Sequence, residues 1–191
     1  MEKEVDFSGE DKDLELVNRV KAGDEIAFER LVSDYQKRIF AFCYRMLLNS
    51  ADAEDAAQEA FIKAYKNIKG FKGESKFSTW LYMIAKNTCL DKFRSKSPKA
   101  SIDEFLADPK PLPEELYAKK EREMILMRGV ERLDEMHRVA LSLIHFEGLS
   151  YEEASHIMEC EIGTAKSRVN RGLEQLGRLL REMLKEKKRE G

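Results

Sequence analysis

Near the carboxyl end of the chain, a short stretch is rich in side chains that donate hydrogen bonds. The run from Gly163 to Arg171 also contains Lys166 and Arg168 and has no acidic residue. Lys, Arg, Ser and Asn side chains near the start of a helix can donate to DNA base edges and to phosphates. The chemistry that these residue types favour is recognition of a polyanion.

The segment before this run has the opposite charge. Between Phe146 and Ile162 there are five glutamates and no Lys or Arg. Ser150 followed by Glu153 predicts a capping box, and Gly148 is expected to end the preceding helix. A short helix, a tight turn with glycine and a longer basic helix are typical of a helix-turn-helix, whose second helix enters the major groove. The alternative is a pair of helices that only packs against the rest of the protein. Its glutamates would then be favoured by the helix dipole near the start of the helix.

The second helix of this motif is expected to have two faces. Its inward face would carry four apolar residues, Val169, Leu173, Leu176 and Leu180. Its outward face would carry four donors, Lys166, Ser167, Asn170 and Arg171. Arg168 is expected nearer the flank, over a phosphate.

A second basic stretch lies in the first half of the chain. From Ile62 to Lys99 there are ten Lys or Arg against two acids, whereas Asn49 to Ala60 holds four acids and no base. Basic side chains interleaved with aromatic ones are typical of single-stranded nucleic-acid binding. Trp80 and Tyr82 are ambiguous, since aromatic residues at helical spacing more often belong to the core. The net charge of −2 hides these blocks and excludes no partner.

Catalysis finds no support in the residue pattern. His137, His145 and His156 show no metal-ligand spacing with the three cysteines, and no glycine loop for phosphate is present. We therefore predict no catalytic residue, no metal and no cofactor. Three scattered cysteines suit a reducing cytoplasm, and Cys160 is either redox-sensitive or a partly buried structural residue.

Apolar residues recur every three or four positions almost throughout, which predicts an all-α fold. Helix starts are expected at Asp24 and at Asn49 or Ser50. All four prolines lie between Pro98 and Pro113. They predict a Pro-rich flexible linker at 97–117 between two small helical domains, at 14–96 and 118–185.

Membrane insertion and secretion are not expected. No apolar run approaches the ~18 residues that span a bilayer, and the charged N-terminus lacks the apolar stretch of a signal peptide. The sequence therefore predicts a cytoplasmic protein.

Two long motifs carry a family resemblance. The run "DAEDAAQEAFIKAYKNIKGFKGESKFSTWLYMIAKNTCLDKFR" and the run "GLSYEEASHIMECEIGTAKSRVNRGLEQL" together resemble the extracytoplasmic-function sigma factors of bacterial RNA polymerase. The resemblance implies a non-catalytic subunit that directs promoter-specific transcription initiation in a stress response. Its two domains would be sigma region 2 at 14–96 and sigma region 4 at 118–185.

The resemblance also implies the partners. Region 2 would bind the clamp helices of the largest polymerase subunit and the −10 promoter element, which it helps to melt. Region 4 would bind the −35 element and the flap of the second-largest subunit. An anti-sigma factor would silence the chain. The linker acids Asp103, Glu104 and Asp108 would either mimic nucleic-acid charge or only keep the tether soluble.

The matching positions give three sets of expected contact residues. For core polymerase the resemblance implies Asp52, Asp55, Gln58, Glu59, Phe61, Ile62 and Tyr65. For the −10 element it implies Phe71, Lys72, Gly73, Glu74, Ser75, Lys76, Phe77, Trp80, Lys86, Asn87, Lys92 and Arg94. In this set the loop 71–77 would accept a flipped base. For the −35 element it implies Thr164, Lys166, Ser167, Arg168, Asn170 and Arg171.

A different class of function remains open, namely a stand-alone helix-turn-helix regulator whose N-terminal helices sense a ligand or dimerise. The segment 71–94 discriminates between a sigma factor and such a regulator, because a ligand-sensing or dimerisation domain is not expected to be both basic and aromatic in this segment.

Overall fold

The computed structural model describes residues 9–95 and 114–190, and this part of the chain contains helices and no strand. The first half forms α1 (Gly9–Lys21), α2 (Glu25–Leu47), α3 (Ser50–Asn67), the 3₁₀ turn η1 (Ile68–Gly70) and α4 (Phe77–Ser95). The second half forms α5 (Glu114–Glu131), α6 (Glu135–Leu141), the π-helical turn η2 (Ser142–Phe146), α7 (Tyr151–Ile157) and α8 (Ile162–Glu190). The all-α prediction is confirmed.

The predicted helix starts are confirmed by their caps. The Asp24 carboxylate accepts from the Ala27 N–H at 3.2 Å, and the Asn49 side chain accepts from the Asp52 N–H at 2.9 Å. Each cap satisfies one of the backbone donors that a helix N-terminus leaves without an intrahelical partner. Between them, Leu48 in the left-handed conformation (φ 57°) ends α2 and turns the chain into α3.

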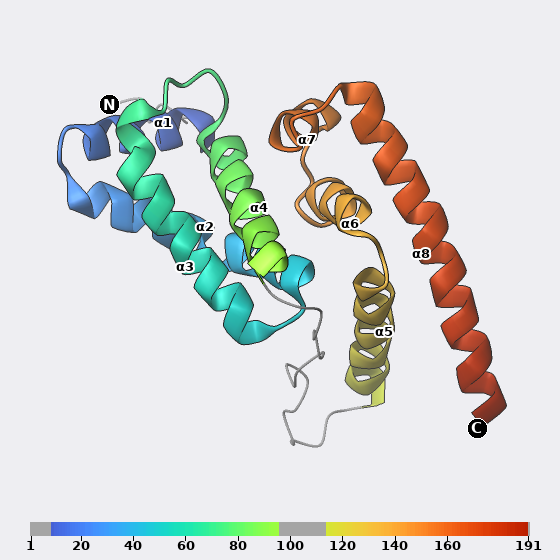
Figure 1. The fold of residues 1–191 in the computed structure, drawn as a ribbon. Helices are drawn as coiled ribbons and strands as arrows, with labels where there is room; N and C mark the ends of the chain where they lie inside the picture. Colours follow the sequence, from blue (N-terminus) through green and yellow to red (C-terminus); the bar gives the residue numbers. More distant parts are fainter. Residues whose placement is uncertain (1–8, 96–113, 191) are drawn as a thin grey trace, which may run out of the picture.

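The N-terminal helices pack around a stripe of alanines on α3. The buried members of this stripe are Ala53, Ala56, Ala57, Ala60 and Ala64. Small side chains let α3 approach α2 on one side and α4 on the other, as Figure 1 shows. Helix α4 has the second half of the chain on its far side, so it is covered from more than one direction. Tyr82, one of the two ambiguous aromatics, is completely buried there.

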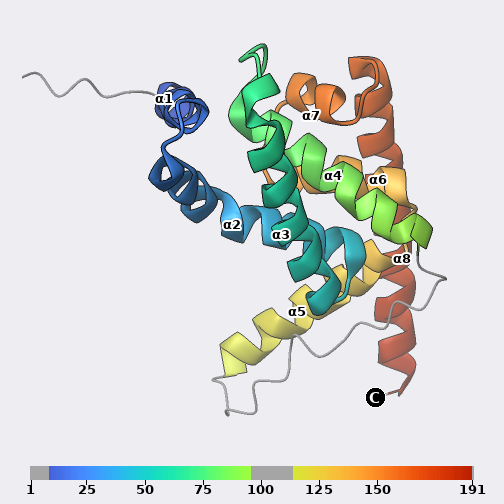
Figure 2. The same ribbon diagram turned by 60° about the vertical axis from the view of Figure 1, so that its left-hand side comes forward.

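The C-terminal helices pack along α8, which runs down the outer side of the molecule in Figures 1 and 2. Its buried stripe is Ala165, Val169, Gly172 and Leu176. A β-carbon at Gly172 would lie 3.1 Å from Leu141 Cγ, so α6 and α8 approach closely at this point.

The prediction that Leu173 points inward is wrong, because 44% of this residue is exposed. The stripe advances by four, three and four residues from Ala165. Gly172 therefore lies on the inward face of α8, and Leu173, the next residue around the helix, faces solvent.

The two halves of the chain contact each other directly. Helix α4 packs against α7, and the end of α2 meets α5, α6 and η2 (Figure 2). Helix α5 begins at Glu114, so positions 114–117 of the predicted linker are helical instead. The rest of that linker, with Asp103, Glu104 and Asp108, lies outside the described residues. None of the described helices is both long and apolar enough to cross a membrane.

Candidate nucleic-acid interface

The helix-turn-helix begins with the predicted capping box. The Glu153 N–H donates to Ser150 Oγ at 3.1 Å, and the Ser150 N–H donates to the Glu153 carboxylate at 2.8 Å. Helix α7 ends at Ile157, and Glu159 adopts the left-handed conformation (φ 52°) in the turn that leads to α8. The capping box is confirmed, and it fixes where α7 begins relative to α8.

The N-terminal turns of α8 present donors to solvent. Thr164, Lys166, Asn170 and Arg171 are exposed, whereas Ser167 and Arg168 are half-buried. The Lys166 ammonium lies 5.7 Å from the centre of the Tyr151 ring, an interaction that keeps it near the helix-turn-helix. Because the buried stripe of α8 lies on the opposite side, these donors can approach a DNA groove without disturbing the core.

Helix α4 keeps one narrow strip open to solvent. Asn87 and Arg94 are exposed, and Trp80 and Met83 are half-buried along the same side at spacings of three, four and seven. Trp80, Asn87 and Arg94 are three of the residues that the family resemblance assigns to the −10 element. The strip therefore gathers an aromatic ring, an amide and a cation on one side of α4.

The loop before α4 is held by a cluster of three aromatic rings. The centre of the Phe71 ring lies 5.1 Å from that of Trp80 and 6.2 Å from that of Phe77. Phe71 is only 5% exposed and Phe77 only 3%. These two rings therefore anchor the loop, while its polar residues Lys72, Gly73, Glu74 and Ser75 lie toward the surface. Gly73 has a φ of 76°, which favours glycine at the tip of the loop.

Two lysines expected to hold −10 phosphates are paired with acids of the helix-turn-helix. Lys76 lies 3.0 Å from the Glu153 carboxylate, and Lys86 lies 2.8 Å from that of Glu159. The Lys86 ammonium lowers the pKa of Glu159. Burial acts to raise the pKa of Glu153, but its bonds to Ser150 and Lys76 outweigh burial and the pKa is lowered.

A third contact between the halves, which the sequence analysis did not predict, centres on Glu147. Its carboxylate accepts from Arg45 of α2 and from the hydroxyl of Tyr82 of α4, and Arg38 approaches it at 3.4 Å. The Glu147 side chain is 5% exposed. Burial and the Glu147 carboxylate both raise the pKa of Tyr82, so its hydroxyl stays protonated and donates. These partners are distant in sequence, so no local pattern indicates them.

Arg138 makes a fourth contact between the halves. Its guanidinium donates to the carbonyl of Glu131 at the end of α5 at 2.6 Å and to that of Leu133 in the following turn at 2.9 Å. It also donates to the carbonyl of Met46 in α2 at 2.7 Å. A cation at helix C-termini satisfies carbonyls that have no intrahelical partner. Burial lowers the pKa of Arg138.

The expected polymerase-binding residues divide between the surface and the interior of α3. Asp55, Gln58, Ile62 and Tyr65 are exposed and follow one another at spacings of three and four. Asp52 and Glu59 are half-buried, and Phe61 is buried at 8% exposure. The exposed residues form one polar and apolar stripe along the helix.

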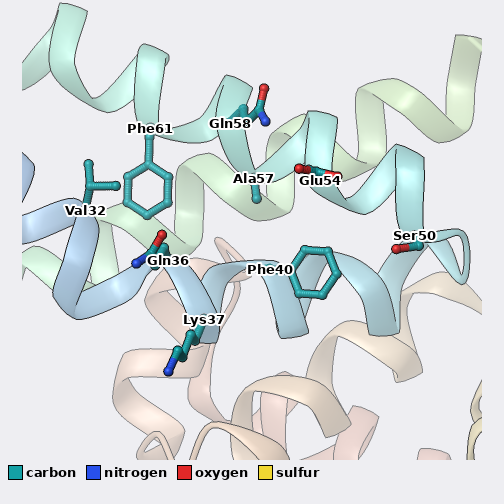
Figure 3. A pocket seen from close by; sticks show the side chains of 9 residues that line it. All are labelled: Val32, Gln36, Lys37, Phe40, Ser50, Glu54, Ala57, Gln58 and Phe61. Carbon is teal, nitrogen blue, oxygen red and sulfur yellow. The ribbon is translucent and has the colours of Figure 1, made fainter. Parts of the chain in front are cut away.

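Beside this stripe, a groove of about 550 Å³ runs between α2 and α3. Figure 3 shows its lining, to which α2 contributes Val32 and Phe40 and α3 contributes Gln58 and Phe61. Phe61, although largely buried, thus lies at the wall of a groove and not in the middle of the core.

The cysteines and histidines assemble no reactive site in the described part of the chain. Cys43 and Cys89 are buried, and the hydrogen bond from Cys43, together with burial, raises the pKa of the Cys89 thiol. Cys160 is half-buried beside Met83 and His156. Within the described ranges, no three His, Cys, Asp or Glu side chains are placed to hold a metal ion.

An all-helical chain with a helix-turn-helix in its second half and a basic aromatic helix in its first belongs to the class of two-domain transcription proteins. Residues 31–98 match the family model of Sigma-70 region 2, and residues 123–176 match that of Sigma-70, region 4. The RNA polymerase sigma-H factor of Pseudomonas aeruginosa is 38% identical over 93% of this chain and 98% of its own length. SigW of Bacillus subtilis is 37% identical over 87% and 96%, and the sigma-E factor of Escherichia coli K12 is 37% identical over 91% and 96%.

The chain belongs to the extracytoplasmic-function family of RNA polymerase sigma factors. Sigma factors are non-catalytic specificity subunits of RNA polymerase, so this chain acts by binding and not by catalysis.

Two solved structures share the fold. One is CnrH in complex with the cytosolic domain of CnrY, with a TM-score of 0.72, 20% identity and coverage of 90% of this chain and 99% of that one. The other is the sigma factor RpoE of Bartonella quintana in complex with the anti-sigma factor NepR. It has a TM-score of 0.67, 26% identity and coverage of 81% and 96%.

Proposed function

We propose that this chain directs core RNA polymerase to promoters by reading two DNA elements with two separate faces. The donors at the start of α8 bind the −35 element. The exposed strip of α4 and the loop before it bind and help to open the −10 element. Promoter binding and opening take place in the cytoplasm, where the polymerase acts.

The observation that carries the proposal is the exposed donor face of α8 directly after a capped helix-turn-helix. Lys166, Asn170 and Arg171 are all exposed and none is needed for the core. Arg can donate two hydrogen bonds to guanine and Asn can donate to and accept from adenine, so this face is suited to reading base edges. In a helical hairpin that served only for packing, these donors would not be expected to gather on one exposed face.

The exposed stripe of α3 is the proposed site for the clamp helices of the largest polymerase subunit. Asp55 and Gln58 supply polar contacts to a basic helix, and Ile62 and Tyr65 supply apolar ones. Ile62 is 53% exposed and Tyr65 43%, and at a spacing of three they present adjoining apolar surface on one side of α3. The flap of the second-largest subunit is the proposed partner of the C-terminal domain.

An anti-sigma factor is the proposed regulator. The Bartonella quintana sigma factor that shares this fold is bound to one. The groove between α2 and α3 adjoins the proposed polymerase-binding stripe, so a partner seated in it would block the polymerase. The domain limits that follow from the proposal are 14–96 for region 2 and 118–185 for region 4.

The test is run-off transcription with purified bacterial core polymerase and a genomic promoter library, with and without the protein. Transcripts that depend on the protein and share paired −35 and −10 motifs are expected. If no transcript depends on the protein while the full chain still retains duplex DNA, the chain acts as a stand-alone helix-turn-helix regulator and the proposal is wrong.

A further inference from the structure

We propose that the free chain holds itself closed through a carboxylate latch. Three glutamates of the second half, Glu147, Glu153 and Glu159, bind groups of α2, of the loop before α4 and of α4, and they must be released before Lys76 and Lys86 can bind DNA. This inference rests on the proposed role of α4 at the −10 element.

Each latch glutamate reaches across to the N-terminal helices. Glu153 pairs with Lys76 at 3.0 Å and Glu159 with Lys86 at 2.8 Å. Glu147 accepts from Arg45 and from the Tyr82 hydroxyl. Glu153 belongs to α7, which lies beside α4 (Figure 2), whereas Glu147 precedes α7 and Glu159 follows it. They therefore join the two halves at several separate points.

Burial separates Lys86 from solvent, whereas the side chain of Lys76 remains 44% exposed and is held by its ion pair. The side chain of Lys86 is 5% exposed, and the carboxylate that pairs with it belongs to the turn of the helix-turn-helix. A lysine covered in this way has no open path to a phosphate. The carboxylates of Glu153 and Glu159 take the place that phosphate oxygens would need to occupy on Lys76 and Lys86.

The spacing of promoter elements leads to the same conclusion. By their position numbers, the −35 and −10 elements lie about 25 base pairs apart, or about 85 Å of duplex at 3.4 Å per base pair. In this structure α7 contacts both α4 and α8, so the two candidate reading helices belong to one packed body. The closed arrangement cannot place α4 and α8 on their two elements at once, so the halves must separate on a promoter.

The latch also accounts for the reversal of charge between α7 and α8. Five glutamates lie between Phe146 and Ile162 without a Lys or Arg. Three of them are the latch, and they face cations of the N-terminal half. The α8 donors begin only after the turn, on a surface that the latch does not cover. The acidic segment is thus complementary to cations of the N-terminal half of its own chain, and α8 is complementary to DNA.

The proposal can be tested with charge-matched variants of the full chain. The latch variant combines Glu147→Gln, Glu153→Gln and Glu159→Gln, and glutamine keeps the capping box at position 153. The control combines Glu152→Gln, Glu174→Gln and Glu182→Gln, three exposed carboxylates for which the described residues provide no ion pair. Both variants gain the same net charge, so any non-specific gain in DNA attraction is common to the two.

The first measurement is the radius of gyration in solution, by small-angle X-ray scattering at about 0.1 M salt. The latch variant is expected to exceed the parent and the control by about 2–5 Å, because two compact bodies on a tether are larger than one. An unchanged radius in the latch variant would overturn the proposal. Circular dichroism checks that its helix content is retained.

An exchange of charges provides a second conformational test. Lys86→Glu alone places two carboxylates together and is expected to expand the chain. Adding Glu159→Lys restores an opposite pair and is expected to return the radius to the parent value. A double variant as expanded as Lys86→Glu would contradict a specific contact between these two side chains.

The second readout is binding of a fluorescein-labelled, random-sequence single-stranded 12-mer. The latch variant is expected to bind at least about fivefold more tightly than the control, because Lys76 and Lys86 become available. An expanded latch variant that binds no better than the control would show that the latch does not cover a DNA-binding side. That outcome would contradict the proposed role of α4 in DNA binding. An unchanged radius of gyration would instead contradict the latch.

Discussion

Helices α4 and α8 carry similar side chains in very different surroundings. On α4, Lys86 is 4% exposed and meets Glu159 of the other half. On α8, Lys166 and Arg171 are exposed and the helix buries only its opposite side. A basic composition therefore indicates that a helix is able to bind a polyanion. Whether it is free to do so is decided by which part of the chain packs against it.

The neighbours differ for a geometric reason. Helix α4 lies between α3 and α7, so two of its sides are covered. The strip that contains Trp80, Asn87 and Arg94 stays open and also carries Asp91, which pairs with Arg94 at 3.7 Å. Helix α8 lies along one edge of the molecule in Figure 1, and Lys166, Asn170 and Arg171 of its first turns are exposed. The comparison predicts that cations inside the contact between the halves act on stability and that those on α8 act on DNA binding.

The largest effect on stability is expected from Arg138→Ala. Arg138 donates to three backbone carbonyls, those of Glu131 at the end of α5, Leu133 in the turn after it and Met46 of α2, and the substitution leaves all three without that donor. Hydrogen bonds from a charged group contribute ~1.5–3 kcal/mol each when measured singly, so a loss of about 3 kcal/mol of unfolding free energy is expected. Urea denaturation measures it. Arg132→Ala, at an exposed neighbouring position, should change the unfolding free energy by less than about 0.5 kcal/mol. Equal losses in both variants would contradict the role of Arg138.

On α8, Arg171→Ala should act on DNA binding and leave stability nearly unchanged. Loss of a base-edge contact costs ~1–3 kcal/mol, or about 5- to 150-fold in affinity. Fluorescence anisotropy with a duplex that contains the −35 motif found by transcription measures it. Arg178→Ala, an exposed arginine two turns further along α8, is the matched control. If both variants weaken binding equally, the contact is general attraction to phosphate and not a reading of the −35 element.

On the exposed strip of α4, Asn87→Ala should separate DNA opening from DNA docking. Asn87 is exposed beside Trp80 and Arg94, so its amide can contact a base without opening the core. We expect duplex binding through α8 to be retained and open-complex formation with core polymerase to fall by roughly tenfold, or about 1.4 kcal/mol. Permanganate reactivity of unpaired thymines at the −10 element measures opening. Asn18→Ala, an exposed asparagine on α1, should behave as the parent, and an Asn87→Ala protein that opens DNA normally would remove this residue from the site.

Much of the local structure could be predicted from the sequence, because caps depend on residues three positions apart. Asp24, Asn49 and Ser150 start their helices as expected, each through a side chain that accepts from the backbone. The alanine stripe of α3 follows the same short-range logic. Of the four donors predicted on the outward face of α8, Lys166, Asn170 and Arg171 are exposed and Ser167 is half-buried.

The burial of Lys86 and the partners of Glu147 could not be predicted in this way. Glu147 bonds to Arg45 and Tyr82, which lie 102 and 65 positions away, and no periodic pattern connects them. Leu173 was misplaced for a related reason, since a glycine carries no hydrophobic signal. Gly172 nevertheless occupies the inward place because α6 comes too close for a side chain.

A smaller effect is expected where α8 meets α6. Gly172→Ala would put a β-carbon 3.1 Å from Leu141 Cγ and 3.2 Å from His137 Cβ, atoms close to the backbone of α6 that cannot easily move away. Overpacking should outweigh the helix propensity of alanine and lower the unfolding free energy by about 1 kcal/mol. In Gly177→Ala on the same helix, the new β-carbon would contact only the flexible end of Arg181. This substitution should raise the unfolding free energy by up to about 1 kcal/mol. Thermal unfolding distinguishes the two, and a stabilising Gly172→Ala would contradict close packing at this point.

The smallest effect is a shift in one titration. Lys86 lowers the pKa of Glu159 from its ordinary 4.5. A group whose pKa is lowered by a contact strengthens that contact above its ordinary pKa, and the contribution is lost as the pH falls through the lowered value. The closed arrangement should therefore weaken below about pH 4.5. Carboxyl ¹³C chemical shifts measure the pKa, which Lys86→Met should return toward 4.5. A Glu159 pKa that is unchanged by Lys86→Met would mean that the pair does not form in solution.

The most direct test of the difference between α4 and α8 is the rate at which their lysines react with an acetylating reagent, followed by mass spectrometry. In the free chain Lys166 should react at the rate of an exposed lysine and Lys86 many times more slowly, because Glu159 and α7 cover it. In the latch variant Lys86 should react faster while Lys166 is unchanged. Equal rates for Lys86 and Lys166 in the free chain would contradict the account, since both basic helices would then be open before DNA is met.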